Sequence, residues 1–152
     1  MTIREIGPLS LLTYSEKVNF NSMAKHVRVK ARDLYGAAHG AGLEITGPLY
    51  WIYHGADGNP DTLFLLDIGL PVTPSENAGP DFIIKRYDSF RCASIVHGGS
   101  WAEFPKVYGK LLSEIQLAGL ELTGENREIY LNMDFTDEKH NITEIQIGIR
   151  NQ

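Results

Sequence analysis

The sequence predicts an α+β fold: an antiparallel sheet with two main helices, arranged as duplicated strand–helix–strand–strand halves with pseudo-twofold symmetry. The segment AGLEITGPLYWIY, residues 41–53, returns as AGLELTGENREIY, residues 118–130, at a constant offset of 77 residues and with eight identical pairs. Each copy follows a stretch of helical periodicity, and each leads into two strand-like segments joined by a turn. Because hairpins pair strands antiparallel, the chain falls in the α+β class.

The first half contains one predicted helix and one predicted hairpin. Apolar side chains recur at steps of three and four from residue 23 to residue 38, which predicts a helix over about Ser22–His39 that ends at Gly40 and Gly42. The turn of the hairpin falls at residues 57–61, DGNPD. The two strands of the hairpin are expected at Leu49–Tyr53 and Leu63–Leu70. A short extended stretch is expected before the helix, at Leu9–Tyr14.

The second half repeats this order after a boundary in residues 73–80, which are rich in Pro, Gly, Ser and Asn. A helix is predicted over about Ser100–Ala118. Ser100 and Glu103 have capping-box spacing, but Pro105 removes a backbone donor, so the helix is expected to begin a few residues later. The strands are expected at Phe82–Tyr87, Cys92–Val96, Arg127–Leu131 and Ile142–Ile149. We expect one domain over residues 1–152, with pseudo-repeats at about 1–75 and 80–150.

The composition limits the class of protein. With 152 residues, of which 43% are hydrophobic, the chain suits one domain with an apolar core. Its net charge is −5 and it has no run of Lys and Arg, which argues against a nucleic-acid partner. The first residues do not form a signal peptide, and no apolar run approaches the roughly 20 residues of a membrane span. We therefore expect no membrane partner and a cytoplasmic location.

Neither a cofactor nor a metal site is indicated. Cys92 is the only cysteine, which excludes an intramolecular disulfide and a Cys-rich zinc site, and we expect it to be buried in a strand. No HExxH or GxSxG motif is present. The five histidines show no metal-ligand spacing: His26, His39, His54, His97 and His140.

The strand after the second repeat copy carries a charged candidate. Glu128 and Tyr130 share one face of this strand, and Ile129 and Leu131 share the other, because strand side chains alternate. Taken alone, the strand predicts that the apolar pair meets the helices and that Glu128 and Tyr130 face water.

The equivalent strand of the first copy changes this expectation. Trp51 and Tyr53 share one face there, and such a pair is rarely left bare to solvent, so this face is covered by core, by a partner chain or by a ligand. If the repeat is a spatial pseudo-twofold, Trp51 and Tyr53 line one cleft with Glu128 and Tyr130. Aromatic faces attract cations, and a carboxylate in an apolar cleft recovers its desolvation cost when a cation arrives. The matching ligand is lipophilic, aromatic and cationic, although plain core packing of Trp51 remains an alternative.

A second motif, HGGSW at residues 97–101, precedes the predicted second helix. Glycines in this position form either an anion site or a tight strand-to-helix turn, and we favour the turn because no Walker or dinucleotide pattern is present. His97 is then a structural residue. Trp101 is either a core residue or a wall of the cleft, and Tyr108, on the apolar stripe of the helix, is a further candidate ligand contact.

The order HGGSWAEFPKVYGKLL, AGLELTGENREIYL and ITEIQIGIR resembles the GyrI-like small-molecule-binding family, which also supplies the effector-binding domains of AraC-type and MerR-type multidrug regulators. The resemblance spans nearly the whole chain and implies a ligand cleft between two duplicated halves. The family glutamate that receives cationic ligands maps onto Glu128, with Tyr130 at the accompanying aromatic position. Ser100-Trp101 departs from the aromatic or Pro-Tyr usual after the HxG turn. No helix-turn-helix segment is recognised, so we expect a stand-alone, transcription regulator-like module.

We therefore expect an effector-binding module with multidrug character and no cofactor, in which Glu128 supplies the charge and Trp51, Tyr53, Trp101, Tyr130 and Tyr108 the aromatic contacts. Two alternatives stay open. Some GyrI-like proteins hydrolyse reactive cyclopropane-bearing compounds; Glu128 would then be the general base and Tyr130 would orient the water. The resemblance also includes gyrase inhibitors, which allows a protein partner, and the aromatic strand face is a candidate homodimer contact.

Overall fold

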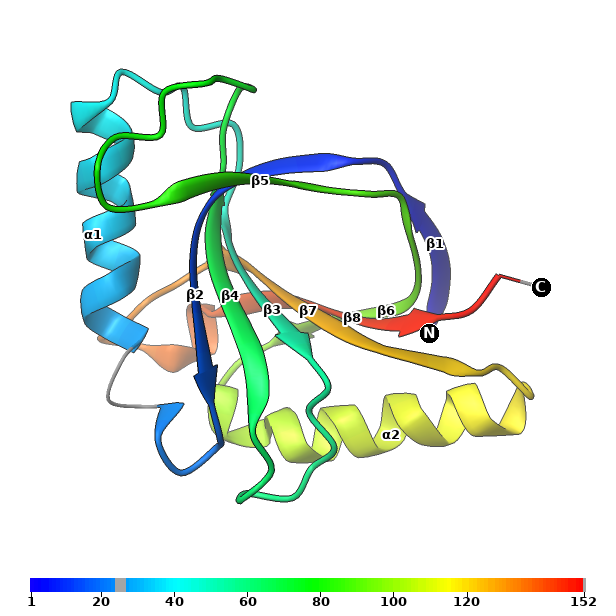
Figure 1. Cartoon of the computed structure of the whole chain (residues 1–152). Helices are drawn as coiled ribbons and strands as arrows, with labels where there is room; N and C mark the ends of the chain where they lie inside the picture. The colour runs from blue at the N-terminus through cyan, green and yellow to red at the C-terminus, as the bar shows by residue number, and fades with distance from the viewer. Residues whose placement is uncertain (24–26, 152) are drawn as a thin grey trace.

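The computed structural model describes residues 1–23 and 27–151, without the side chains of residues 27–29. Eight strands form one antiparallel sheet in the order β1-β6-β8-β7-β3-β4-β2-β5, and two helices pack against it (Figure 1). The helices are α1 (Val27–Gly40) and α2 (Phe104–Leu117). The strands are β1 (Thr2–Ile6), β2 (Leu9–Val18), β3 (Leu49–His54), β4 (Phe64–Pro71), β5 (Ile83–Tyr87), β6 (Phe90–Gly98), β7 (Leu122–Asn132) and β8 (Ile142–Ile149). The predicted α+β class is confirmed.

The strand order is symmetric about its centre. Read outward from the central pair β7 and β3, each side continues with the second hairpin strand, then the strand before the helix, then an edge strand. The edge strands are exchanged: β1 precedes the first half in the chain but pairs with β6 of the second, and β5 pairs with β2 of the first. Strand β1 was not predicted from the sequence. Each half is thus completed by a strand that precedes the other half in the chain.

The AGLE part of the repeat forms the C-terminal cap of each helix. The N–H of Leu43 donates to the carbonyl of Ala38 (2.9 Å), and the N–H of Leu120 donates to that of Ile115 (3.2 Å). Between the helix and each leucine, Gly42 and Gly119 adopt positive φ angles of 68° and 69°. This is the Schellman arrangement, in which glycine takes the left-handed conformation without a Cβ penalty. The same cap occurs at the same repeat position in both halves.

Both helices lie on one face of the sheet (Figure 1). The strand registers place Ile68, Trp51, Glu128 and Ile145 in one row across β4, β3, β7 and β8, so these side chains share the helix face. Leu34 of α1 and Leu111 of α2 are fully buried on it. Cys92 is buried in β6, as expected.

The row corrects one prediction about the central strands. Glu128 and Tyr130 point to the helix face and are buried, whereas Ile129 lies on the opposite face. The expectation that Ile129 and Leu131 meet the helices was therefore wrong. The prediction assumed that the polar face of an antiparallel strand points to water. In this sheet, helices cover one face, and the other face is covered around Ile52 by Leu11 and Tyr87.

The helix starts also differ from the prediction. Ser22 is not a helical residue but lies in a turn, where its N–H donates to the carbonyl of Asn19 (3.2 Å). The next part of the predicted helix, residues 24–26, lies outside the described residues. In the second half, Ser100 caps a short 3-10 turn (Trp101–Glu103), and α2 follows at Phe104 with Pro105 in its first turn. The expected late start of α2 is explained by this extra turn, and the capping box does not form.

Candidate functional site

The candidate site is centred on the pair of strands at the middle of the sheet. Trp51 of β3 and Glu128 of β7 are direct partners in the ladder, and they are also equivalent residues of the repeat. A residue that pairs with its own counterpart must lie on the pseudo-twofold axis. The position at which the two halves differ in chemistry is therefore the point at which they meet.

A cavity of about 890 Å³ opens beside this pair, on the helix face. Five residues predicted from the sequence line it: Trp51, Tyr53, Trp101, Glu128 and Tyr130. Tyr108 is not part of the lining, but its hydroxyl reaches Glu128 from α2. The structure thus gathers the other five predicted side chains around the Glu128 carboxylate.

Three tyrosine hydroxyls hold that carboxylate. Oε1 of Glu128 accepts from the hydroxyls of Tyr53 (2.8 Å) and Tyr130 (2.6 Å), and Oε2 accepts from that of Tyr108 (2.6 Å). Glu128 is only 4% exposed. Among the described residues, no Lys, Arg or His forms an ion pair with it. The negative charge is thus solvated by neutral donors alone.

Burial sets the protonation behaviour of this cluster. Desolvation raises the pKa of Glu128 above its ordinary value, and the hydrogen bonds from Tyr108, Tyr130 and Tyr53 oppose that rise. Desolvation, followed by the nearby Glu128 carboxylate, raises the pKa of Tyr108 well above the usual value for a phenol. Tyr53 and Tyr130 respond to burial in the same direction. The phenols therefore stay protonated and remain donors.

A second buried carboxylate, on the opposite face, provides a contrast. Asp67 of β4 accepts from Ser15 (2.5 Å) and Tyr87 (2.7 Å), and it lies within 3.3 Å of the Lys85 ammonium and 3.0 Å of the His54 ring. Burial acts to raise the pKa of Asp67, but His54 and the other partners hold it well below its usual range. Asp67 thus has a cationic partner, Lys85, within the protein, and Glu128 has none among the described residues.

The walls of the cavity are aromatic. Trp51 and Trp101 both meet the Tyr130 ring edge-on, with ring centroids 5.4 and 5.7 Å apart. Neither indole N–H has a hydrogen-bond partner among the described residues. For both tryptophans, the sequence left open whether the side chain packs in the core or lines a cleft. The structure shows both roles, because Trp51 and Trp101 pack against Tyr130 and also line the cavity.

Sequence reasoning missed the remaining lining residues. These lie on the segment before α1, on α1 itself, on β3, at the start of α2 and after β7: Phe20, Met23, Ala31, Arg32, Tyr35, Leu49, Phe104, Met133 and Phe135. The helical periodicity contained a usable signal, since Ala31 lies on the apolar stripe and Tyr35 follows one turn later. Phe20 and Phe135 lie in loops, and no periodicity places a loop side chain at the rim.

The HGGSW segment forms the expected turn. Ser100 Oγ accepts from the N–H of Ala102 (3.1 Å), and the His97 ring lies 3.0 Å from the carbonyl of Ser100. His97 also lies 3.3 Å from a carboxylate oxygen of Glu103. This turn sets Trp101 against the cavity, so the motif acts by positioning a wall.

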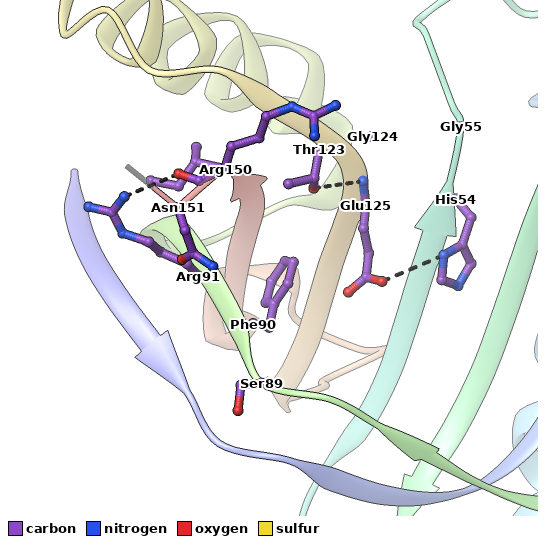
Figure 2. Close-up of a pocket in the computed structure, with 11 residues that line it drawn as sticks. His54, Gly55, Ser89, Phe90, Arg91, Thr123, Gly124, Glu125, Arg150 and Asn151 are labelled. Atoms are coloured by element: carbon purple, nitrogen blue, oxygen red, sulfur yellow. Dashed lines mark hydrogen bonds and ion pairs between the residues drawn. The ribbon is translucent and has the colours of Figure 1, made fainter.

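A more polar cavity of about 680 Å³ lies at the end of β3, on the other face (Figure 2). Arg91, Phe90, Glu125 and Arg150 surround it in Figure 2. Its two arginines already pair with acids, Arg91 with Glu5 (3.0 Å) and Arg150 with Glu121 (3.5 Å). The aromatic cavity, whose carboxylate has no cationic partner among the described residues, is therefore the better candidate site.

The described part of the chain contains neither a cluster suited to a metal ion nor a membrane-spanning helix. Within residues 1–23 and 27–151, no group of three or more His, Cys, Asp or Glu side chains is placed to hold a metal ion. Over the same residues, no helix has the length and apolar content needed to cross a bilayer.

Comparison with solved structures places this geometry in a known fold. The C-terminal domain of EcmrR matches with a TM-score of 0.79 and 20% identity, covering 99% of this chain and 97% of that one. SAV2435 bound to tetraphenylphosphonium matches with a TM-score of 0.69 and 15% identity, covering 99% and 93%. A hydrolase encoded by lin2189 from Listeria innocua matches with a TM-score of 0.66 and 15% identity, covering 98% and 91%. At these identities the likeness shows the fold alone.

The comparisons also bear on length and family. In the complex of EcmrR with DNA, the present chain spans 57% of the matched chain. No curated protein matches the sequence. The profile of the GyrI-like small molecule binding domain matches residues 1–150. With nearly its whole length matched, the chain belongs to the GyrI-like small-molecule-binding domain family.

Proposed function

We propose that this domain is an effector-binding module for lipophilic, aromatic cations, which bind in the cavity between α1, β3 and β7 with their charge toward Glu128. One observation carries the proposal: Glu128 is a buried carboxylate that receives three neutral hydroxyls and no cation from the described protein. Leaving such a charge without a counter-ion is costly, and an arriving cation recovers part of that cost.

The rest of the cavity supports the same ligand class. Trp51, Trp101 and Tyr130 present aromatic surface, which attracts delocalised cations and flat apolar rings. A volume of about 890 Å³ accommodates a molecule of drug size. SAV2435, which shares the fold, is bound to tetraphenylphosphonium, a lipophilic aromatic cation. That compound is therefore a suitable probe.

Calorimetric titration with tetraphenylphosphonium tests the proposal. Glu128→Gln keeps the shape of the side chain and removes its charge, and it should weaken binding by about 1–3 kcal/mol, the worth of a partly desolvated charge contact. Glu76→Gln is the matched control, because Glu76 is exposed in the loop before β5 and does not line the cavity. Equal affinity in the wild type, Glu128→Gln and Glu76→Gln would show that the charge of Glu128 does not contribute to binding.

A second candidate function is hydrolysis of reactive electrophiles, with Glu128 as general base. The raised pKa of Glu128 favours it, because a base works best when its pKa lies near the working pH. Oε2 accepts only the Tyr108 hydroxyl among the described residues, so it retains an acceptor position for a water. Turnover of a cyclopropane-bearing electrophile that is lost in Glu128→Gln would support catalysis; equal decay rates with and without the protein would exclude it for that compound.

A further inference from the structure

The cavity carries two charges, and they lie at different depths. Among its described lining residues, only Glu128 and Arg32 are charged. Glu128 is buried beneath its three tyrosine hydroxyls, whereas Arg32 is exposed. The described site therefore has a negative floor and a positive rim.

Arg32 is held at this rim by its place on α1. Ala31, Arg32 and Tyr35 of this helix all line the cavity, and positions three and four apart in a helix share a face. Ala31 packs against the core, while Tyr35 is 41% exposed. Along this face, the chain thus passes from the core at Ala31 to water at Arg32.

Arg32 also lacks a charged or hydrogen-bonding partner among the described residues, unlike most described arginines. Four others form ion pairs with carboxylates: Arg4, Arg91, Arg127 and Arg150. No described residue forms an ion pair or a side-chain hydrogen bond with Arg32. A guanidinium in this state is ready to receive a planar anionic group, which it binds bidentately.

An unpaired rim cation changes which occupants suit the cavity. It repels a ligand that is only cationic, and it attracts the outer end of a ligand that also carries an anion. Building on the proposed function, we propose that the ligands this cavity favours are amphoteric: an aromatic cation directed at Glu128, joined to a carboxylate or similar anionic group that reaches Arg32.

A matched pair of dyes tests this proposal. An aromatic xanthene dye is prepared as its ethyl ester, which is a pure cation, and as its free carboxylic acid, which is a zwitterion of nearly the same shape. Affinities are measured by fluorescence polarisation in the wild type, Arg32→Gln and Arg86→Gln. Arg86 is the control, because it is exposed on β5, has no ion pair with a described residue and does not line the cavity.

The expected result is a change in preference between the two dyes. Arg32→Gln should weaken the acid form about 5-fold, the upper range for a solvent-exposed ion pair, and leave the ester unchanged or slightly tighter. Arg86→Gln should leave the ratio of the two affinities as in the wild type. If Arg32→Gln leaves that ratio unchanged, or Arg86→Gln shifts it equally, the amphoteric ligand class is wrong while the cation site stands. If neither dye binds the wild-type protein, the proposed function fails as well.

Discussion

The two halves of the molecule agree where they build the scaffold and differ where they meet the cavity. Leu34 of α1 and Leu111 of α2 are equivalent under the 77-residue offset, and both are fully buried. Under the same offset, Tyr108 of α2 corresponds to Ala31 of α1, and Glu128 corresponds to Trp51.

These paired differences account for the position of the cavity. In the second half, a long phenol from the helix reaches the carboxylate on the central strand, and the space between them is filled. In the first half, Ala31 and Trp51 occupy the two equivalent positions, no phenol extends from the helix, and both residues line the cavity. A duplicated fold can therefore create a site when one copy omits a contact that the other copy keeps.

The largest expected effect concerns the scaffold. Leu34→Ala and Leu111→Ala should each lower the free energy of unfolding by about 2–5 kcal/mol, because each leaves a cavity in a fully buried site. Urea denaturation of both variants measures the two losses. Similar losses would confirm that the halves are equivalent here; a loss below about 1 kcal/mol in only one variant would break that equivalence.

Rebuilding the missing contact should close the cavity. Ala31→Tyr places in the first half the side chain that the second half carries at residue 108, so that a phenol competes with the ligand for the cavity, and steric overfilling of this kind costs about 1–3 kcal/mol. Binding of tetraphenylphosphonium should fall by a similar free energy in a calorimetric titration. Gly36→Tyr is the control, since this position on α1 faces open space. Undiminished binding by Ala31→Tyr would show that the ligand lies elsewhere.

The smallest effect at neutral pH concerns titration of Glu128. Its pKa is raised, so a cation should lose its charged partner on acidification before an ordinary glutamate, with a pKa near 4.5, would be protonated. Tyr108→Phe removes a bond that lowers this pKa, so the fall in affinity should begin at higher pH. Binding isotherms over a pH series measure the shift, and Glu128→Gln should abolish this part of the pH dependence. Identical profiles for the wild type and Tyr108→Phe would contradict the role of Tyr108.

The same raised pKa has a consequence for stability. The unliganded protein holds the Glu128 proton more tightly than the unfolded chain does, so this contribution to stability is full below the ordinary pKa near 4.5. It is lost as the pH rises through the raised pKa. Thermal unfolding of the ligand-free protein should therefore show that Glu128→Gln costs least, or even stabilises, at neutral pH. A neutral-pH destabilisation larger than that at acid pH would oppose this sign.

Most of the fold could be predicted from the sequence, because each element expected in one half had an equivalent at the matching position of the other half. The repeat aligned the helix caps and both hairpins. Strand β1 was not predicted, because its five residues, TIREI, are exposed along most of their length and no equivalent edge strand was recognised in the other half. The strand of Glu128, taken alone, wrongly predicted that this side chain faces water. The equivalent strand with Trp51 led to the correct prediction that it lines a cleft. The loop residues at the rim, Phe20 and Phe135, depend on tertiary packing that no local pattern encodes.

The most direct test of the shared site uses the two tryptophans of the chain, both of which line the cavity. In Trp101→Phe, Trp51 is the only tryptophan of the chain, so the emission comes from the first half and changes when a ligand binds beside it. Glu128 belongs to the second half, so its substitution tests whether both halves contact the same ligand. Titration with tetraphenylphosphonium should change this emission saturably, and adding Glu128→Gln should raise the dissociation constant by about 5- to 150-fold, equivalent to about 1–3 kcal/mol. A saturable change with the same constant in both proteins, or no change at all, would contradict a cation site built from Trp51 and Glu128.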